Sequence, residues 1–463
     1  MVNFNYKNMK KKTVSIVLLV CLLITSTFLN AQPKINLKLY AALADNKSGD
    51  ISMSAFPIVK RSEMKIPITY SGNTYNAVKD FNISNKGIIS TREHLQKAID
   101  EISSKGGGTL IFPAGKYLME TVLMKSNVHL KFNPNALLLC GKPSTKSTKG
   151  LNMVMFFFGK DDELCENASI ECTDLTKHFT VKVSDELWGF RFATFQKAKH
   201  FFLSGLTVLD NYSVYSSITF SSTKKTPENI KNHFVGATDG IITDVAIYKG
   251  NFGYGTIQAQ AAQNVRFYNL YGEGGVTLRL ETGDKRMNNA QWGGVFDIKA
   301  RNIMAVRAHS AFLLGSHAMH NGVVDASDIT AISCGSAAQI GNGNVSVKYD
   351  QNAGLTPGTC EGGTLKNIVA YFGYNSQVKT KSLGYLPVEL FNKVGVPDEK
   401  LVCYPCPSLI AVKFTAQFPY NFEANTVTAI GFPKNMKPIW TNDPVVSESQ
   451  KAEIKKLLAK MKK

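Results

Sequence analysis

The feature that most constrains the fold of this chain is a short unit that recurs in its central part. Each unit is a run of apolar and β-branched residues, an Asn, Asp or Gly turn, and a second short strand. The second strands are TIQAQ at 256–260, TLRLE at 277–281, AFLLGSH at 311–317 and AAQIGNG at 337–343. Units that cannot bury an apolar face alone must stack on one another, so the repeat predicts a solenoid.

The local pattern indicates which kind of solenoid forms. Most units start about 20 to 40 residues apart, and no helical period of adequate length runs through the region. Short β-branched strands with turn residues between them favour parallel stacking of strands. We therefore predict an all-β chain whose main domain is a parallel β-helix.

One helix is predicted ahead of the repeats. Ser90 and Glu93 form a capping-box pattern, and an apolar stripe follows at Leu95, Ala98, Ile99 and Ile102. Such a helix can cover the open end of a β-helix and protect its unpaired strand edge. The segments GGGTLIFPAGKY and SNVHLKFNPNA come next. This order resembles the pectin-lyase-like superfamily of polysaccharide lyases and hydrolases, which implies a right-handed β-helix but no particular reaction.

The remaining organisation follows from composition along the chain. Four lysines precede the apolar run VSIVLLVCLLITSTFL, which predicts a signal peptide at 1–31 and a secreted protein. The alternative is an uncleaved membrane anchor, for which the run is shorter than the ~20 residues of a span. We expect an N-terminal extension at 32–66, the β-helix at 67–432, and a tail at 433–463 that ends in a basic helix. Within the β-helix the repeat dissolves at about 345–411, which predicts an inserted loop or small subdomain on the functional side.

The charge of the chain indicates its partner. The formal net charge is +18, and removal of 1–31 takes away four lysines and no acidic residue, which leaves 18 − 4 = +14. A secreted protein this basic is expected to bind a polyanion, although a generally solvated basic surface is the alternative. The sequence contains no recognised nucleic-acid-binding motif, so we expect no nucleic-acid partner. After signal cleavage we expect a monomer without membrane attachment.

Seven cysteines follow the signal segment, and export permits disulfides. The odd number leaves at least one thiol free. The local pairings to test are Cys165 with Cys172, and Cys360 with Cys403 or Cys406. For the Cys403–Cys406 pair we favour a structural role over zinc or redox chemistry, because a second CxxC and a thioredoxin-like pattern are both missing.

Arg279 and Glu281 provide the first candidate chemistry. Side chains two apart on a strand share a face and lie ~6.5 to 7 Å apart along it. Glycoside hydrolysis needs one carboxylic acid to protonate the leaving oxygen and a second group to handle water or attack the sugar. A direct bond from Arg279 would keep Glu281 ionised, whereas a general acid must carry a proton. We therefore expect Arg279 to point toward an anionic substrate, and Glu281 to be partly desolvated.

Three motifs in successive turns make the resemblance more specific. IQAQ, LRLETG and GSHAMH, in this order, resemble the iota-carrageenases, glycoside hydrolase family 82, over most of the chain after residue 31. The resemblance implies an endo-acting hydrolase that cleaves the β-1,4 linkages of iota-carrageenan, a sulfated galactan, with inversion. It implies Glu281 as general acid, Gln258 as the residue that places the water and a bound chloride, and His317 as the residue that holds the site geometry. It implies no cofactor for the chemistry, and a structural calcium for which the sequence shows no tight motif.

One position departs from that family's pattern. Reference members carry an aspartate two residues after the acid as the proposed base, and this chain has Gly283 there. Asp284 is the nearest substitute, and we expect a turn or bulge at Gly283 to bring it to the correct side, since glycine permits the required backbone angles. The alternative is that another turn supplies the base while Gln258 holds the water.

The resemblance also suggests which residues contact substrate. Sulfate esters are permanently charged, and the planar fork of arginine suits their oxygens. The candidate sulfate ligands are Arg279, Lys285, Arg286 and Arg307, and the candidate sugar platforms are Tyr254 and Trp292. Each of these could instead be solvated charge or ordinary packing. A pectinase, a polysaccharide lyase and a non-catalytic glycan-binding solenoid remain alternatives, although the polygalacturonase signatures are not found in the sequence.

Overall fold

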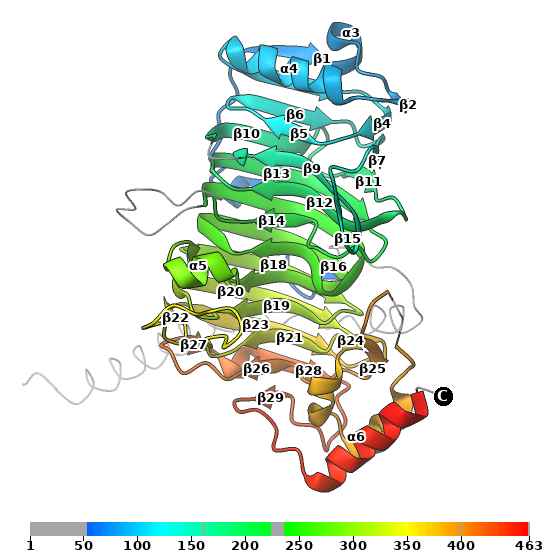
Figure 1. The fold of residues 1–463 in the computed structure, drawn as a ribbon, viewed down its shortest axis with the longest axis vertical. Helices are drawn as coiled ribbons and strands as arrows, with labels where there is room; N and C mark the ends of the chain where they lie inside the picture. The colour runs from blue at the N-terminus through cyan, green and yellow to red at the C-terminus, as the bar shows by residue number, and fades with distance from the viewer. Residues whose placement is uncertain (1–52, 161–162, 224–235, 398–399, 462–463) are drawn as a thin grey trace, which may run out of the picture.

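The computed structural model describes residues 53–160, 163–223, 236–397 and 400–461, which form one tall parallel β-helix (Figure 1). The predicted signal peptide and most of the predicted extension before residue 53 lie outside the described residues. The first turns contain β1 (Asn73–Asn76), β2 (Lys86–Ser90), β3 (Gly108–Phe112), β4 (Gly115–Met119), β5 (Val122–Met124), β6 (Val128–Phe132), β7 (Ala136–Cys140), β8 (Thr145–Ser147) and β9 (Gly150–Phe158).

The central turns contain β10 (Cys165–Cys172), β11 (Phe179–Lys182), β12 (Leu187–Phe195), β13 (Ala198–Leu209), β14 (Ile218–Phe220), β15 (Ala237–Ala259), β16 (Ala261–Glu281), β17 (Gly294–Phe296), β18 (Ile298–Val306), β19 (Ser310–Gly315), β20 (His320–Ile332) and β21 (Ser336–Ile340). The last turns contain β22 (Thr359–Gly362), β23 (Thr364–Tyr371), β24 (Ser376–Val378), β25 (Tyr404–Cys406), β26 (Val412–Phe414), β27 (Asn421–Phe422), β28 (Val427–Ile430) and β29 (Ile439–Trp440). The predicted fold class is confirmed.

The four strands that define the sequence repeat lie on successive turns in parallel register. Gln258 pairs with Arg279, Arg279 with Leu313, and Leu313 with Gln339. Their neighbours, which alternate to the other side of each strand, form a buried row inside the solenoid: Ile257, Leu278, Phe312 and Ala338. This two-residue period therefore places one apolar row in the core and, apart from Leu313, one polar row on the outer face.

The turns between strands are stabilised by stacked Asn and Asp side chains. Asn269 and Asp244 both have positive φ, the left-handed conformation that these residues tolerate better than most. The Asn269 amide donates to Asp244 Oδ1 at 3.0 Å, and the Asn302 amide donates to Asn269 Oδ1 at 3.0 Å. These bonds satisfy buried polar groups and fix the register of one turn on the next.

The N-terminal end is closed by α4 (Arg92–Ser104), as predicted, with α3 (Ala77–Phe81) beside it (Figure 1). Leu95, Ala98, Ile99 and Ile102 are all buried. Before the first strand, a segment with a short 3-10 helix at Arg61–Glu63 runs along the side of the solenoid. It is attached there by bonds such as Val59 N–H to Asn269 Oδ1 at 2.9 Å.

The predicted insertion at 345–411 is wrong in its extent. β22 and β23, within that range, pair with β20, so the β-helix resumes there. The irregular chain forms two separate excursions, at 341–358 and at 372–411, and the second contains 3-10 helices at Thr380–Tyr385 and Val388–Lys393. The Gly- and Pro-rich composition hid the short returning strands. β29 also continues the stack beyond residue 432.

The predicted basic helix is α6 (Glu448–Met461). Its apolar residues pack against the apolar cluster of the second excursion: Ile454, Leu457, Leu458 and Met461. The α6 helix therefore holds that excursion at the C-terminal end of the column (Figure 1). No helix among the described residues is both long and apolar enough to cross a bilayer.

The predicted disulfides are absent from the structure, where all seven described cysteines are free. Cys165 and Cys172 lie at opposite ends of β10. Seven residue steps along a strand span about 23 Å, far beyond the ~6 Å between Cα atoms that a disulfide allows. The pairing of Cys165 with Cys172 is therefore wrong.

Candidate active site

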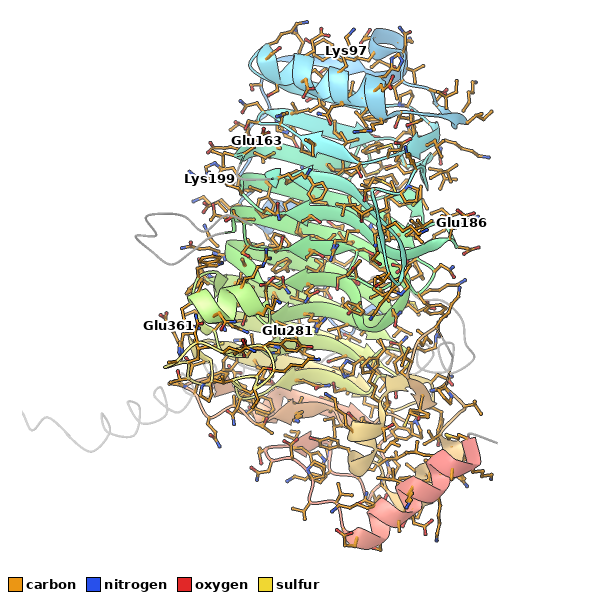
Figure 2. The ribbon with its side chains drawn as sticks, in the orientation of Figure 1. Lys97, Glu163, Glu186, Lys199, Glu281 and Glu361 are labelled. Atoms are coloured by element: carbon orange, nitrogen blue, oxygen red, sulfur yellow. The ribbon has the colours of Figure 1, made fainter. Side chains whose placement is uncertain are left out.

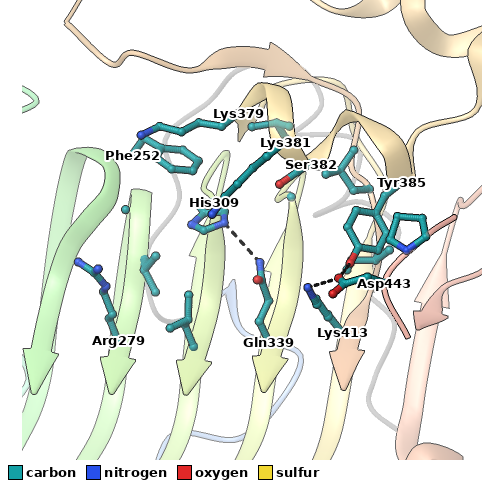
Figure 3. A pocket seen from close by; sticks show the side chains of 18 of the residues that line it. Phe252, Arg279, His309, Gln339, Lys379, Lys381, Ser382, Tyr385, Lys413 and Asp443 are labelled. Carbon is teal, nitrogen blue, oxygen red and sulfur yellow. Dashed lines mark hydrogen bonds and ion pairs between the residues drawn. The ribbon is translucent and has the colours of Figure 1, made fainter. Parts of the chain in front are cut away.

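The outer face of the strands from β16 to β26 forms the floor of a cleft of about 540 Å³. Figure 3 shows Arg279 on β16, Gln339 on β21 and Lys413 on β26, with His309 just before β19 and Lys379, Lys381 and Ser382 above them on the second excursion. The cleft is lined by four cations, Arg279, Lys379, Lys381 and Lys413, and by two carboxylates, Glu281 and Asp443. A cleft of this composition suits a negatively charged ligand.

Glu281, labelled in Figure 2, is the carboxylate on the first strand of this face, and both of its oxygens have a partner. Oε2 forms an ion pair with the Arg279 guanidinium, and Oε1 lies 3.0 Å from His317 Nε2. The Glu281 side chain is 19% exposed. The expectation that Arg279 would not bond Glu281 directly is wrong for this structure, because the two side chains share one strand face and form an ion pair.

The surroundings of Glu281 keep His317 neutral and Arg279 charged at neutral pH. Burial, and then the nearby Arg279 charge, lower the pKa of His317 below its ordinary value. Burial also lowers the pKa of Arg279 to about 10, which leaves the guanidinium charged at neutral pH. In a neutral His317, Nε2 either donates or accepts a hydrogen bond, depending on the tautomer.

Gly283 serves a purpose that the sequence did not predict. It has no positive φ, so its backbone freedom is not used to turn the chain, contrary to our expectation. Instead the His317 ring occupies the space that a side chain would need: a Cβ at Gly283 would lie 2.7 Å from His317 Nε2. The loss of the side chain at 283 and the position of His317 are therefore linked by packing.

Asp284 begins α5 (Lys285–Ala290) as its N-cap. Its Oδ1 accepts from the Arg286 N–H at 2.8 Å, and its Oδ2 accepts from Arg286 Nη2 at 2.9 Å. Burial opposes ionisation, but the bonds from Arg286 outweigh it and lower the pKa of Asp284. The role of Asp284 as base stays a prediction, and a base there would have to compete with Arg286 for the carboxylate.

Gln258 lies beside Arg279 in the strand register, one turn toward the N-terminus. It is partly exposed on the same outer face. Next to Glu281 on the other side is Gly315, where a Cβ would be 3.5 Å from the Glu281 Cγ. The bare backbone at Gly315 therefore leaves that flank of the Glu281 carboxylate open to a ligand.

The chain resembles proteins of one kind along most of its length. A curated iota-carrageenase from Alteromonas macleodii is 29% identical over 476 residues, covering 88% of this chain and 93% of that protein. The solved structure of a 1,3-alpha-1,4-beta-D-galactose-4-sulfate-3,6-anhydro-D-galactose-2-sulfate 4 galactohydrolase superposes with a TM-score of 0.72 and 27% identity, covering 87% of this chain and 96% of that one. A solved iota-carrageenase complexed to iota-carrageenan fragments gives 0.69 and 25%, covering 87% and 99%.

The chain is a homologue of the iota-carrageenases. No family model matches it. The predicted resemblance is confirmed by these relatives, which match most of the chain.

Several cleft residues of this iota-carrageenase homologue were missed in the sequence. Lys379 and Lys381 belong to the second excursion, and Lys379 Nζ lies 4.7 Å from the centre of the Phe252 ring. Lys413 forms an ion pair with Asp443 at 2.5 Å, which in turn accepts from the Tyr385 hydroxyl at 2.7 Å. The only available signal was the expectation that the irregular region would lie on the functional side.

His309 lines the same cleft. Its ring stacks on Phe252 with 4.4 Å between ring centres, and its Nε2 lies 3.4 Å from the Gln339 amide nitrogen. Enclosure, followed by the charges of Arg279, Lys381 and Lys379, lowers the pKa of His309 to about 3. His309 is therefore a neutral wall of the cleft at neutral pH.

The other predicted substrate ligands separate into three groups. Tyr254 lies by the site, with the Arg279 guanidinium 5.7 Å from the centre of its ring. Lys285 and Arg286 are exposed on α5. Arg307 is elsewhere: it pairs with Glu273 at 3.2 Å in a separate cavity of about 230 Å³, so the structure does not place it among the residues of the main cleft.

Trp292 is also misplaced in the sequence prediction. It is only 6% exposed and packs in a small cluster under α5 with Ala261, Met287 and Met319. Its apolar ring is buried because α5 folds back over it, so it cannot stack on a sugar. Among the described residues no three His, Cys, Asp or Glu side chains come together to hold a metal ion, and no step below is assigned to calcium.

Proposed function

We propose that this chain is a secreted glycoside hydrolase that cleaves the β-1,4 linkages within iota-carrageenan chains, with Glu281 as the general acid. The observation that carries the proposal is the position of Glu281, which opens onto a cleft lined by four cations. The similar proteins named above are iota-carrageenases, and one of their structures is a complex with iota-carrageenan fragments. A sulfated galactan is a polyanion with regularly spaced charges, which matches the four cations placed along the cleft.

Arg279 links substrate binding to the protonation of Glu281. In the free protein the guanidinium neutralises Glu281, which favours the carboxylate form. A sulfate ester that takes the guanidinium would leave Glu281 without that partner and next to His317 alone. Loss of the positive charge and exclusion of water by the polymer both raise the pKa of a carboxyl group, so the bound state favours the protonated acid.

The reaction follows from that state. Glu281 donates its proton to the glycosidic oxygen as the bond to the anomeric carbon breaks, and a water molecule attacks that carbon from the opposite face. The water gives one proton to a base, for which Asp284 remains the proposed residue, and keeps the other in the new hydroxyl on the anomeric carbon. Gln258, beside Arg279, is proposed to place the water, and a chloride near it is the proposed bound halide. His317 holds Glu281 at Oε1.

The test compares three polysaccharides and follows two signals of cleavage. Purified protein is incubated with iota-carrageenan, kappa-carrageenan and polygalacturonate, while reducing ends and ultraviolet absorbance are followed together. The proposal expects new reducing ends from iota-carrageenan without an increase in absorbance. Absorbance that rises with the reducing ends would identify a lyase, activity on polygalacturonate would identify a pectinase, and binding without cleavage would identify a glycan-binding solenoid.

A further inference from the structure

The cleft ends at Arg279, but a line of aromatic rings and cations continues from there toward the N-terminal turns. The Tyr254 ring faces Arg279, and the Tyr215 ring lies 6.2 Å from the Tyr254 ring, edge to face. The Trp188 ring lies 5.7 Å from the Tyr215 ring, again edge to face. We define Trp188, Tyr215 and Tyr254 as the aromatic strip. All three rings are partly exposed.

Each end and one side of the aromatic strip carry a cation. The Arg191 guanidinium lies 3.7 Å from the centre of the Tyr215 ring, and its Nε donates to the Thr219 hydroxyl at 3.2 Å. Lys149, an exposed residue, places its ammonium 5.7 Å from the centre of the Trp188 ring. The three rings follow one another and the cations flank them, a pattern that offers flat apolar faces with charge nearby.

The position of Tyr215 is built into the local structure. Its φ is 131°, a backbone conformation that a bulky residue adopts only when its surroundings impose it. Gly189 makes room for the ring, because a Cβ there would lie 2.4 Å from Tyr215 Cε2. Backbone strain and a bare glycine together hold this ring between Trp188 and Tyr254, which a solvated surface residue would not need.

The strip and the cleft form one continuous track. β12 pairs with β14, β14 with β15, and β15 with β16, so Trp188 lies on the third strand before Glu281 along the stack (Figure 1). At ~4.8 Å per strand, this extends the track about 14 Å beyond the strand that carries Glu281. The cleft extends in the opposite direction to Lys413. Glu281 therefore lies within the track rather than at one end.

We propose that the aromatic strip, with Lys149 and Arg191, is a second binding region for the same polymer, in which sugar faces stack on the rings and sulfate groups meet the cations. This inference rests on the proposed function. It places polymer on both sides of the scissile bond and makes the binding of long chains stronger than that of short ones.

The test uses Trp188→Ala and Lys149→Ala, with Tyr374→Ala as the control. Tyr374 is an exposed tyrosine outside the strip, 51% exposed, that packs edge to face on Phe372. KM and kcat are measured on long iota-carrageenan and on its shortest cleavable oligosaccharides, and thermal unfolding checks that each variant is folded. Lys149 is exposed, so its variant remains informative if removal of Trp188 disturbs the fold.

For Trp188→Ala we expect KM for the long polymer to rise about tenfold, the effect of losing the burial of one aromatic face, with kcat unchanged. Lys149→Ala should raise the same KM by a smaller factor that shrinks as salt is added. The short oligosaccharides should show no change. KM values for the long polymer equal to those of Tyr374→Ala in both variants would overturn the inference, whereas an inactive parent protein would overturn the proposed function instead.

Discussion

The contact between Gly283 and His317 gives the sharpest prediction for the catalytic centre. In Gly283→Ala the new Cβ would lie 2.7 Å from His317 Nε2 and 2.9 Å from two ring carbons, closer than side chains pack. The backbone of His317 cannot easily move away, because its carbonyl accepts from Asn344 N–H and from Gly358 N–H, both at 2.7 Å. The ring must therefore turn, and its 3.0 Å bond to Glu281 must break.

The size of the effect follows from that bond. A hydrogen bond to a charged group contributes about 1.5 to 3 kcal/mol, which corresponds to a loss of roughly 10- to 150-fold in kcat/KM if His317 positions Glu281 in the transition state. The assay is the release of reducing ends from iota-carrageenan over a range of substrate concentrations. The backbone at Gly283 has no positive φ, so alanine is compatible with it and the fold should persist.

A matched control is Gly362→Ala, in which the nearest atom to the new Cβ is 3.8 Å away and φ is not positive. This variant should keep the parent kcat/KM. Gly283→Asp, which restores the aspartate of the reference family pattern, should lose activity as well, because it has the same Cβ. Parent-level kcat/KM in Gly283→Ala would refute the link between the glycine and the histidine.

Three further predictions concern charge. Lys381→Gln, in the rim of the cleft, should raise KM for iota-carrageenan several-fold at low salt and little at high salt, since salt screens exposed charges. If Asp284 is the base, Asp284→Asn should lower kcat at least ~100-fold. Stability should not change, because Asn caps a helix as well as Asp does. A decrease in kcat of less than about threefold would leave Asp284 with the role of N-cap only. Burial raises the pKa of Asp210 to about 6 from 3.8, so the folded protein binds this proton more tightly than the unfolded chain does. The protonated Asp210 therefore stabilises the fold fully below about pH 4, and this stabilisation is lost as the pH rises through 6. Asp210→Asn should therefore raise the free energy of unfolding by up to about 3 kcal/mol at pH 7.5 and by little at pH 4. Denaturant titration at the two pH values measures this, and an equal effect at both would contradict the raised pKa of Asp210.

The repeat predicted the fold well because strand period and turn residues are local properties. TLRLE alone shows that Leu278 and Leu280 lie on one side and Arg279 and Glu281 on the other, and stacking then places Gln258 beside Arg279. The end of each repeat strand could be predicted in the same way. This is why the Glu281 position on an outer face was available from the sequence.

The remaining site residues depend on contacts between distant segments. Lys379 and Lys381 reach the cleft because the second excursion folds back over the strands, and its irregular composition does not encode that path. Trp292 was expected on the surface, but α5 covers it, a packing outcome that no local period reports. The use of Gly283 was also not local, since the atom that needs its space belongs to His317, 34 residues later in the sequence.

The most direct test of the central claim is kcat of Glu281→Gln on iota-carrageenan, measured with binding of the same polymer and with Glu361→Gln as a control for an exposed glutamate on β22. Glutamine cannot donate a proton as an acid, but it keeps the shape of the side chain and leaves the cationic cleft in place. We expect kcat to fall by about 10² to 10⁴ while the polymer is still bound, with the control unchanged. A Glu281→Gln protein that retains the parent kcat would contradict the account.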